Sequence, residues 1–111
     1  MVVTNNPDIK SRTFEFSVKI VELYQYLRNE KKEFTLGNQL LRSGTSIGAN
    51  VEEATAAQSK RDFVAKMSIS LKEARETNYW LRLLKRTRYI KKEDLIIESE
   101  EIMNILGAII R

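Results

Sequence analysis

Residues 59–86 read SKRDFVAKMSISLKEARETNYWLRLLKR, and this stretch carries the clearest helical signal in the chain. Small or apolar residues recur in it every third or fourth position and keep a seven-residue repeat over three heptads. The members of this stripe are Phe63, Met67, Ser70, Ala74, Thr77, Leu81 and Leu84. Ser59, followed three residues later by Asp62, is typical of a capped helix start. We therefore predict a long helix over residues 60–87.

The same spacing occurs before and after this stretch. The stripes are Ile9, Thr13, Phe16, Ile20, Leu23 and Leu27, then Gly37, Leu40, Gly44, Ile47, Val51 and Ala54, and finally Leu95, Ile102, Leu106 and Ile109. We expect a wider buried face on the first helix, formed by Phe14, Val18, Val21 and Tyr24, and flanking apolar residues on the last, namely Ile96, Met103 and Ile110. The predicted helices cover approximately residues 8–29, 35–57, 60–87 and 92–110.

Two local signals refine these helices. Asn6, Pro7 and Asp8 offer a cap, a first-turn proline and an acid that suits a helix start. Gly44 and Gly48 each weaken a helix by about 1 kcal/mol relative to alanine, so they persist most readily where another backbone must approach. We expect a tight helix crossing at these glycines.

The fold class follows from the helix count and the short links. A chain of 111 residues and 12.9 kDa is the usual size for one domain. Helices joined by links of roughly 4 to 6 residues favour antiparallel neighbours. We predict an all-α protein, an antiparallel up-down-up-down four-helix bundle that forms a single domain over residues 1–111.

Composition excludes several classes of chemistry. The chain has no cysteine and no histidine, which removes most hydrolase, redox and zinc chemistry, and also the Glu-x-x-His pairs of di-iron bundles. The acidic pairs Glu52–Glu53 and Glu73–Glu76 are of the kind that solvated helix faces produce routinely. We expect no enzyme activity, no catalytic residue, no metal and no cofactor. No apolar run approaches the ~20 residues that cross a bilayer, and no signal peptide is recognisable, so we expect a cytoplasmic protein without a membrane partner.

A basic stripe lies on the predicted third helix, away from its apolar stripe. It consists of Lys72, Arg75, Tyr79, Arg82 and Arg86, and Lys85 enlarges it. Cations at this spacing can follow phosphates while an aromatic ring offers a stacking surface, so the stripe is a candidate nucleic-acid contact. The alternative is a solvated or self-neutralised face, because residues 93–101 hold five acids and no base. An antiparallel fourth helix would bring those acids near the basic end of the third.

Other surface features point to association. Arg42, Ser46, Asn50 and Glu53 form a line on the second helix, which indicates either a hydrogen-bonded contact with another chain or helix, or ordinary exposure. Large apolar side chains also occupy more than one face of two helices, Phe14 with Phe16 and Ile109 with Ile110. Surplus apolar surface usually marks an interface, although a four-helix core also needs a broad stripe.

The run RSGTSIGANVEEA over residues 42–54 resembles the signature of the bacterial 23S rRNA intervening-sequence, or four helix bundle, proteins. The resemblance continues through Asp62-Phe63 and the run SLKEA at residues 70–74. Gly48 stands where the family frequently has proline, and Ala54 where it frequently has glycine. The resemblance implies an antiparallel four-helix fold, a ring-like homopentamer and no catalytic residue. The family that the chain resembles also includes accessory proteins of diversity-generating retroelements, which bind a reverse transcriptase and nucleic acid.

The sequence thus predicts a non-enzymatic oligomer that acts as an adaptor or scaffold for RNA or a ribonucleoprotein. Its predicted contacts are Lys72, Arg75, Tyr79, Arg82, Lys85 and Arg86, and its predicted partners are further copies of itself and RNA, DNA or a nucleic-acid-handling protein. The alternative is a protein-only interaction module, in which the basic stripe is solvated surface.

Overall fold

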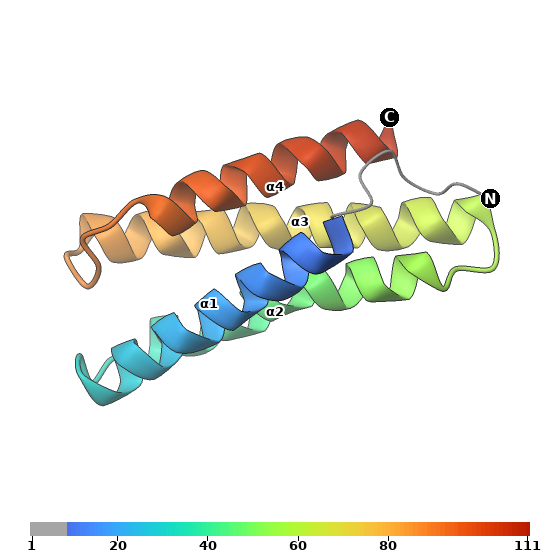
Figure 1. The fold of residues 1–111 in the computed structure, drawn as a ribbon. Coiled ribbons are helices and arrows are strands. Elements are labelled where there is room, and N and C mark those ends of the chain that lie inside the picture. Colours follow the sequence, from blue (N-terminus) through green and yellow to red (C-terminus); the bar gives the residue numbers. More distant parts are fainter. Residues whose placement is uncertain (1–8) are drawn as a thin grey trace.

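A computed structural model describes residues 9–111, which form four helices in antiparallel order (Figure 1). They are α1 (Ile9–Asn29), α2 (Thr35–Thr55), α3 (Lys60–Arg86) and α4 (Asp94–Ile110). Each end that can be compared lies within two residues of its predicted position. Residue 8 and the predicted cap at Asn6 to Asp8 lie outside the described residues. The predicted four-helix bundle is confirmed, and residues 9–111 contain no strand.

Helix α3 forms as its sequence predicts. Ser59 is extended, and its hydroxyl oxygen accepts a hydrogen bond of 3.0 Å from the Asp62 N–H, which caps the helix. All seven members of the predicted stripe are buried. Two small polar members of the stripe form hydrogen bonds with α2. The Ser70 hydroxyl donates to the Ile47 carbonyl oxygen at 2.8 Å, and the Thr77 Oγ1 lies 2.9 Å from the Ser43 Oγ. The stripe therefore fixes α3 against α2 by hydrogen bonds as well as by packing.

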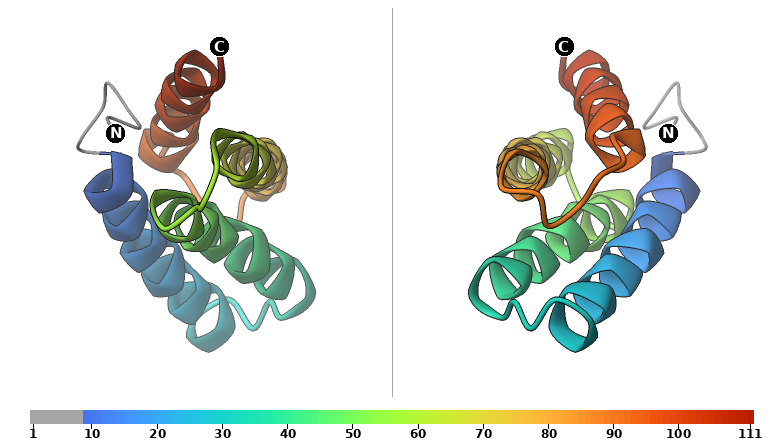
Figure 2. Two further views of the ribbon diagram at one scale, coloured as in Figure 1. Left: turned by 90° about the vertical axis from the view of Figure 1, so that its right-hand side faces the viewer. Right: turned by 90° about the vertical axis from the view of Figure 1, so that its left-hand side faces the viewer.

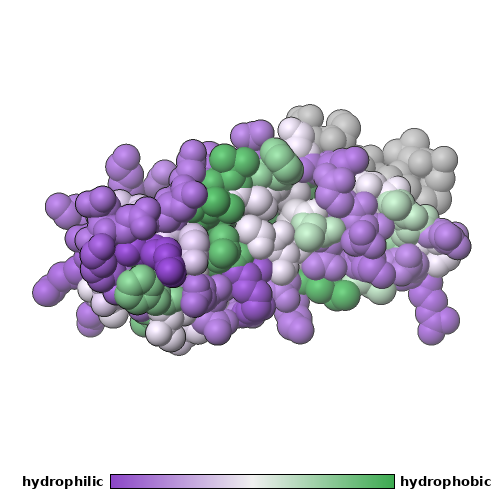
Figure 3. Space-filling view, turned by 90° about the horizontal axis from the view of Figure 1, so that it is seen from below, coloured by the Kyte–Doolittle hydropathy of each residue, from purple (hydrophilic) through white to green (hydrophobic). Residues whose placement is uncertain are grey.

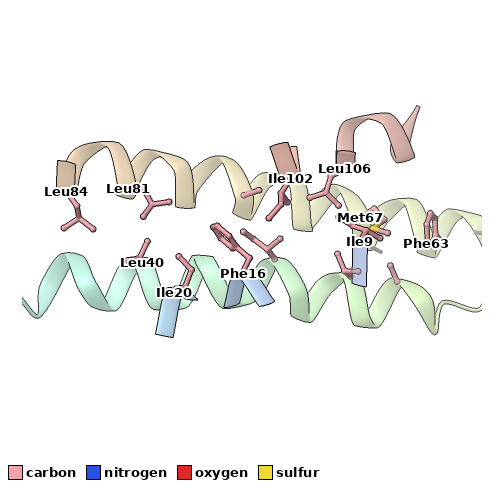
Figure 4. Close-up of a cluster of buried hydrophobic side chains, with 14 of the residues drawn as sticks. Ile9, Phe16, Ile20, Leu40, Phe63, Met67, Leu81, Leu84, Ile102 and Leu106 are labelled. Atoms are coloured by element: carbon pink, nitrogen blue, oxygen red, sulfur yellow. The ribbon is translucent and has the colours of Figure 1, made fainter. Parts of the chain in front are cut away.

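The core contains side chains from all four helices (Figure 4). Phe16 and Ile20 of α1, Leu40 of α2, Leu81 of α3 and Ile102 of α4 are all fully buried. Each comes from a stripe that the sequence predicts. Burying one such side chain contributes about 1.5–3 kcal/mol, so this shared core is the main source of the bundle's stability.

Helix α1 crosses α2 closely at the predicted glycines. A Cβ atom built on Gly48 would lie 3.1 Å from the carbonyl oxygen of Thr13. The hydroxyl of Thr13 donates to the Ile9 carbonyl oxygen at 2.8 Å, so this buried polar residue is satisfied within its own helix. The prediction of a tight crossing at Gly44 and Gly48 is confirmed.

Each helix packs against the next one in the sequence. A closed bundle would therefore also need α1 to pack against α4. They approach each other near one end and diverge toward the end that holds the 30–34 and 87–93 connections (Figures 1 and 2). Ion pairs tie them together: Glu98 of α4 lies 3.7 Å from Arg12 Nε and 2.9 Å from Lys19 Nζ. The Glu98 carboxylate, mainly through its hydrogen bond, raises the pKa of Lys19. Ion pairs therefore join α1 and α4 along part of their length, and the two helices are apart toward the end that holds the 30–34 and 87–93 connections.

The predicted extra width of the α1 stripe is wrong. Phe14, Val18 and Val21 are exposed, at 59%, 38% and 36% of their surface. Only Tyr24 of this group is partly buried, where it lies against Gly37 of α2. The physical reason is that α1 packs chiefly against one helix, α2, so a narrow stripe satisfies it and the next apolar residues face outward.

Between residues 9 and 111, no helix combines the length and apolar character that a bilayer crossing requires.

Candidate nucleic-acid interface

The basic stripe lies on the outer surface of α3, because the opposite side of this helix carries the buried heptad. Five of its six members are exposed, and Lys85 is partly buried. Four of the six come together with the first turn of α4 around a groove of about 530 Å³; these are Tyr79, Arg82, Lys85 and Arg86. Leu83 and Ile96 supply apolar wall, and Glu93 is its one acid. Lys72 and Arg75 lie farther along α3 and do not line the groove.

A chain of hydrogen bonds holds Arg82 in the groove. Its Nε donates to Asn78 Oδ1 at 2.8 Å, and Asn78 Nδ2 donates to Ser99 Oγ of α4 at 2.9 Å. The Ser99 hydroxyl then donates to the Ile96 carbonyl oxygen at 2.7 Å. Asn78 and Ser99 are buried, so the guanidinium is anchored to the core at Nε. Its two terminal nitrogens make no hydrogen bond or ion pair within residues 9–111 and are available to a ligand.

Tyr79 is the aromatic member of the stripe. The Arg82 guanidinium carbon lies 5.8 Å from the centre of the Tyr79 ring, within cation–π range. Tyr79 also meets Trp80 edge-on, with the ring centres 5.1 Å apart. Tyr79 is 49% exposed. An exposed ring beside a held guanidinium is a stacking surface of the kind that single-stranded nucleic acids use.

One acid just before α4 pairs with this stripe, and two acids within α4 pair with α1. Glu93 pairs with Lys85 at 3.0 Å, but Glu98 and Glu101 turn to α1 and pair with Arg12 or Lys19. The expectation that acids of residues 93–101 would lie near the basic end of the third helix is met by Glu93, whereas Glu98 and Glu101 pair with α1 instead. The rotation of α4 about its axis decides this, since it buries Ile102 and Leu106 and carries Glu98 to the α1 side.

In the described chain, residues 9–111, no carboxylate pairs with Lys72, Arg75, Arg82 or Arg86. Solvated cations gathered along one face attract polyanions most strongly when no acid is interleaved. The stripe thus has the electrostatic character of a phosphate-binding surface.

The line on α2 has a different role from the stripe. Arg42 reaches across to α3, where it pairs with Glu73 at 3.4 Å and, more closely, with Glu76. Glu76 also accepts a hydrogen bond of 3.0 Å from the Trp80 indole N–H. Arg42 thus makes the contact with another helix that the sequence suggested, and it makes it inside the chain.

The hydrogen bonds of Ser46 and Asn50, two other members of that line, are made within α2. The Ser46 hydroxyl donates to the Arg42 carbonyl oxygen at 2.7 Å, and the Asn50 side-chain amide donates to the Ser46 carbonyl oxygen at 2.8 Å. Glu53 is exposed. These back-bonds satisfy the Ser46 hydroxyl and the Asn50 amide N–H within their own helix.

The acidic pairs are also accounted for. Glu73 and Glu76 share Arg42, and Glu52 lies 3.5 Å from Lys10. Throughout residues 9–111, no three acidic side chains come together in a way that suits a metal ion.

An apolar surface lies on the α1–α2 side of the molecule. Figure 3 views this side and shows hydrophobic patches in its middle and mostly hydrophilic surface toward both ends. The exposed residues Phe14, Val18 and Val21 recur at helical spacing along α1. We call them the α1 apolar stripe. Exposed apolar side chains in a row typically mark contact with another protein.

Comparison with known proteins agrees with this architecture. Residues 5–110 match a family model described as 23S rRNA-intervening sequence protein. A crystal structure of a protein with unknown function from the S23 ribosomal protein family of Bacteroides thetaiotaomicron superposes with a TM-score of 0.91. The two chains are 53% identical, and the match covers 93% of this chain and 98% of the other. A search of curated proteins found no match.

Proposed function

The chain belongs to the 23S rRNA-intervening sequence protein family, and from this premise we propose that it is a non-enzymatic, self-associating bundle that serves as an adaptor or scaffold for RNA or a ribonucleoprotein. The observation that carries the RNA part is the groove beside α3. Its three cations, Arg82, Lys85 and Arg86, face a single acid, Glu93, which pairs with Lys85. Arg82 is anchored through Asn78, and the exposed Tyr79 lies beside it.

The chemistry of the groove suits a flexible polyanion. Arg82 can offer two free nitrogens to a phosphate, and Arg86 adds a second guanidinium one turn later. Lys72 and Arg75 extend the cationic line for two further turns of α3. Such a row binds the backbone of a strand with little regard to its sequence, which suits a scaffold.

Self-association is the second part of the proposal. The α1 apolar stripe supports it, since a second copy would remove Phe14, Val18 and Val21 from water. The family resemblance implies a ring of five copies. Light scattering coupled to size exclusion tests this directly, and we expect a mass several times that of one 12.9 kDa chain. A monomer at all concentrations would contradict it.

The RNA part is tested by titration of a labelled single-stranded RNA at two salt concentrations. We expect affinity to fall steeply as salt rises, because phosphate contacts release counterions. Arg75→Glu with Arg86→Glu is the informative variant, because neither side chain makes an ion pair within residues 9–111. We expect it to weaken binding by at least about tenfold at low salt, because each substitution removes about one interaction with a phosphate.

The matched control is Lys60→Glu with Arg61→Glu. These exposed residues lie at the opposite end of α3, and the change in net charge is the same. The control should bind RNA nearly as well as the unaltered protein. Equal weakening by both variants would mean that net charge alone attracts the RNA, and absence of binding at low salt would reject the proposal.

The alternative is a protein-only interaction module, which the α1 apolar stripe favours. A pull-down from cell extract with and without nuclease separates the two. Under the RNA proposal, nuclease treatment releases the captured partners. Capture that is unchanged by nuclease but lost with Val18→Lys would favour the protein-only module.

A further inference from the structure

A second cavity lies at the end of the bundle where α1 and α4 diverge. It is separate from the groove that Tyr79, Arg82, Lys85 and Arg86 line, which we call the α3 groove. Beyond the ion pairs of Glu98, helices α1 and α4 diverge, and a cavity of about 450 Å³ lies between α1, the 87–93 connection and the first turn of α4. Leu23, Ile90 and Leu95 give it apolar walls. This volume falls within the range of sites that bind small organic groups. We call it the end cavity.

Two tyrosines also line the end cavity, Tyr26 from α1 and Tyr89 from the connection. Tyr26 is 43% exposed. Tyr89 is held in place because its N–H donates to the Leu84 carbonyl oxygen at 2.9 Å, at the end of α3. Just before it, Arg88 adopts a left-handed conformation with φ of 71°, which turns the connection back against the helix. The cavity therefore offers aromatic rings from two different elements.

Cations surround the end cavity. Lys31, Arg88, Lys91 and Lys92 line it, against the single acid Asp94. Across residues 9–111, no carboxylate forms an ion pair with any of these four cations. An apolar, aromatic interior with a cationic rim fits a ligand that has a flat ring and adjoining negative charge.

The position of the end cavity narrows the ligand class. The α3 groove ends at Lys85 and Arg86, and the connection that follows carries Arg88, Lys91 and Lys92 to the cavity. A strand whose phosphates lie along the groove therefore meets the cavity at its next contacts. An acidic peptide with an aliphatic anchor would use the same cations, but its anchor gains only apolar contact from the two tyrosine rings, whereas a base also stacks on them. Stacking on aromatic rings is the mode by which unpaired bases are held.

We infer that the end cavity takes an unpaired base of a single-stranded RNA, which stacks on Tyr26 or Tyr89 while Arg88, Lys91 and Lys92 hold the flanking phosphates. This inference rests on the proposed function, because the same strand lies in the α3 groove. It adds a preference: the protein distinguishes single strands from duplexes, whose bases are paired and stacked already.

The test compares a short labelled single-stranded RNA with the same strand annealed to its complement, at low salt. We expect the single strand to bind on the order of tenfold more tightly than the duplex, the effect of one stacked base. Tyr26→Leu with Tyr89→Leu should remove this preference and leave the duplex affinity unchanged. Phe34→Leu is the matched control, since Phe34 is an exposed aromatic residue at the same end of the bundle but does not line the cavity.

A second readout addresses the cavity itself. A fluorescent purine analogue within the strand should be quenched on binding to the unaltered protein and not on binding to the tyrosine variant. Should the double variant fail to fold by circular dichroism, Tyr26→Leu alone carries the test, because this ring is already partly in water. Quenching that persists without the tyrosines would overturn the inference.

The outcomes separate the two proposals. If neither single strand nor duplex binds, the proposed function fails and the end cavity fails with it. If both bind equally well, or if the tyrosine variant keeps its preference for single strands, the end-cavity inference fails and the RNA scaffold stands. Displacement of the purine analogue by an acidic, leucine-containing peptide, together with equal binding of the two RNA forms, would assign the cavity to a protein partner instead.

Discussion

Gly44 of α2 faces Ile20 of α1 so closely that a Cβ atom built on the glycine would lie 2.8 Å from Cγ2 and 2.9 Å from Cγ1 of the isoleucine. Ile20 is fully buried and branched at Cβ, so it cannot rotate aside without disturbing the core. The approach of α1 to α2 therefore depends on the absence of a side chain at this position.

We predict that Gly44→Ala lowers the free energy of unfolding. The added methyl group would force the helices apart, at a cost of about 1–3 kcal/mol, and the better helix propensity of alanine would offset about 1 kcal/mol of it. Urea denaturation followed by circular dichroism measures the difference. Gly107→Ala is the control, because the nearest atom to its added Cβ, Arg111 Nη1, would be 3.7 Å away.

In the control, the propensity gain acts without the clash, so we expect a rise of up to about 1 kcal/mol. If both alanine variants stabilised the protein equally, the close crossing would not be a constraint on this fold.

The helices and their core stripes were predictable because alternating three- and four-residue spacing is a local property of the sequence. The rotation of each helix against its neighbours is not local. The spacing alone could not show that α1 packs chiefly on α2, so Phe14 and Val18 were assigned to the core when they face outward. The same rotation decides that Glu98 faces α1 and not the basic stripe.

The buried pair Asn78–Ser99 was also missed, although a signal for it existed. The α4 stripe steps from Leu95 to Ile102, and Ser99 fills the position four residues after the first and three before the second. A serine in a core position needs a buried partner, and only the packing of α3 on α4 identifies that partner as Asn78.

Ser99→Ala should therefore destabilise the bundle by about 1–3 kcal/mol, since it leaves the Asn78 amide buried without its acceptor. Asn78→Leu in the same background should cost less than it does alone, because the two residues are coupled. A double-mutant cycle by chemical denaturation measures this coupling. Strictly additive losses would mean that the two side chains act independently.

The same pair should influence RNA binding. Without Asn78 the Arg82 guanidinium loses its anchor at Nε, while the number of cations along α3 is unchanged. We predict that Asn78→Leu weakens RNA binding at low salt and leaves the salt dependence unaltered, because the number of neutralised phosphates sets the slope. A changed slope together with unchanged affinity would contradict this role.

Arg42 offers a test that uses the one tryptophan of the chain. The Glu76 carboxylate pairs with Arg42 and accepts a hydrogen bond from the Trp80 indole N–H. Loss of the arginine would therefore leave the carboxylate free to move. We predict that Arg42→Met shifts the tryptophan emission and lowers the free energy of unfolding by under about 1 kcal/mol, as for an exposed ion pair. The mass of the proposed oligomer should not change, and a fall in mass would place Arg42 at an interface between copies.

The α1 apolar stripe gives the sharpest prediction about assembly. Each large apolar side chain that a second copy covers contributes about 1.5–3 kcal/mol, so Phe14→Lys with Val18→Lys should dissociate the proposed oligomer. Both residues are exposed within one chain, and the variant should keep its helical content. Ile97→Lys is the control, because Ile97 is 51% exposed but lies on α4, away from this stripe. Light scattering should show the mass of one chain for the α1 variant and the full assembly for the control, and an unchanged mass in both would exclude the α1 stripe as the contact.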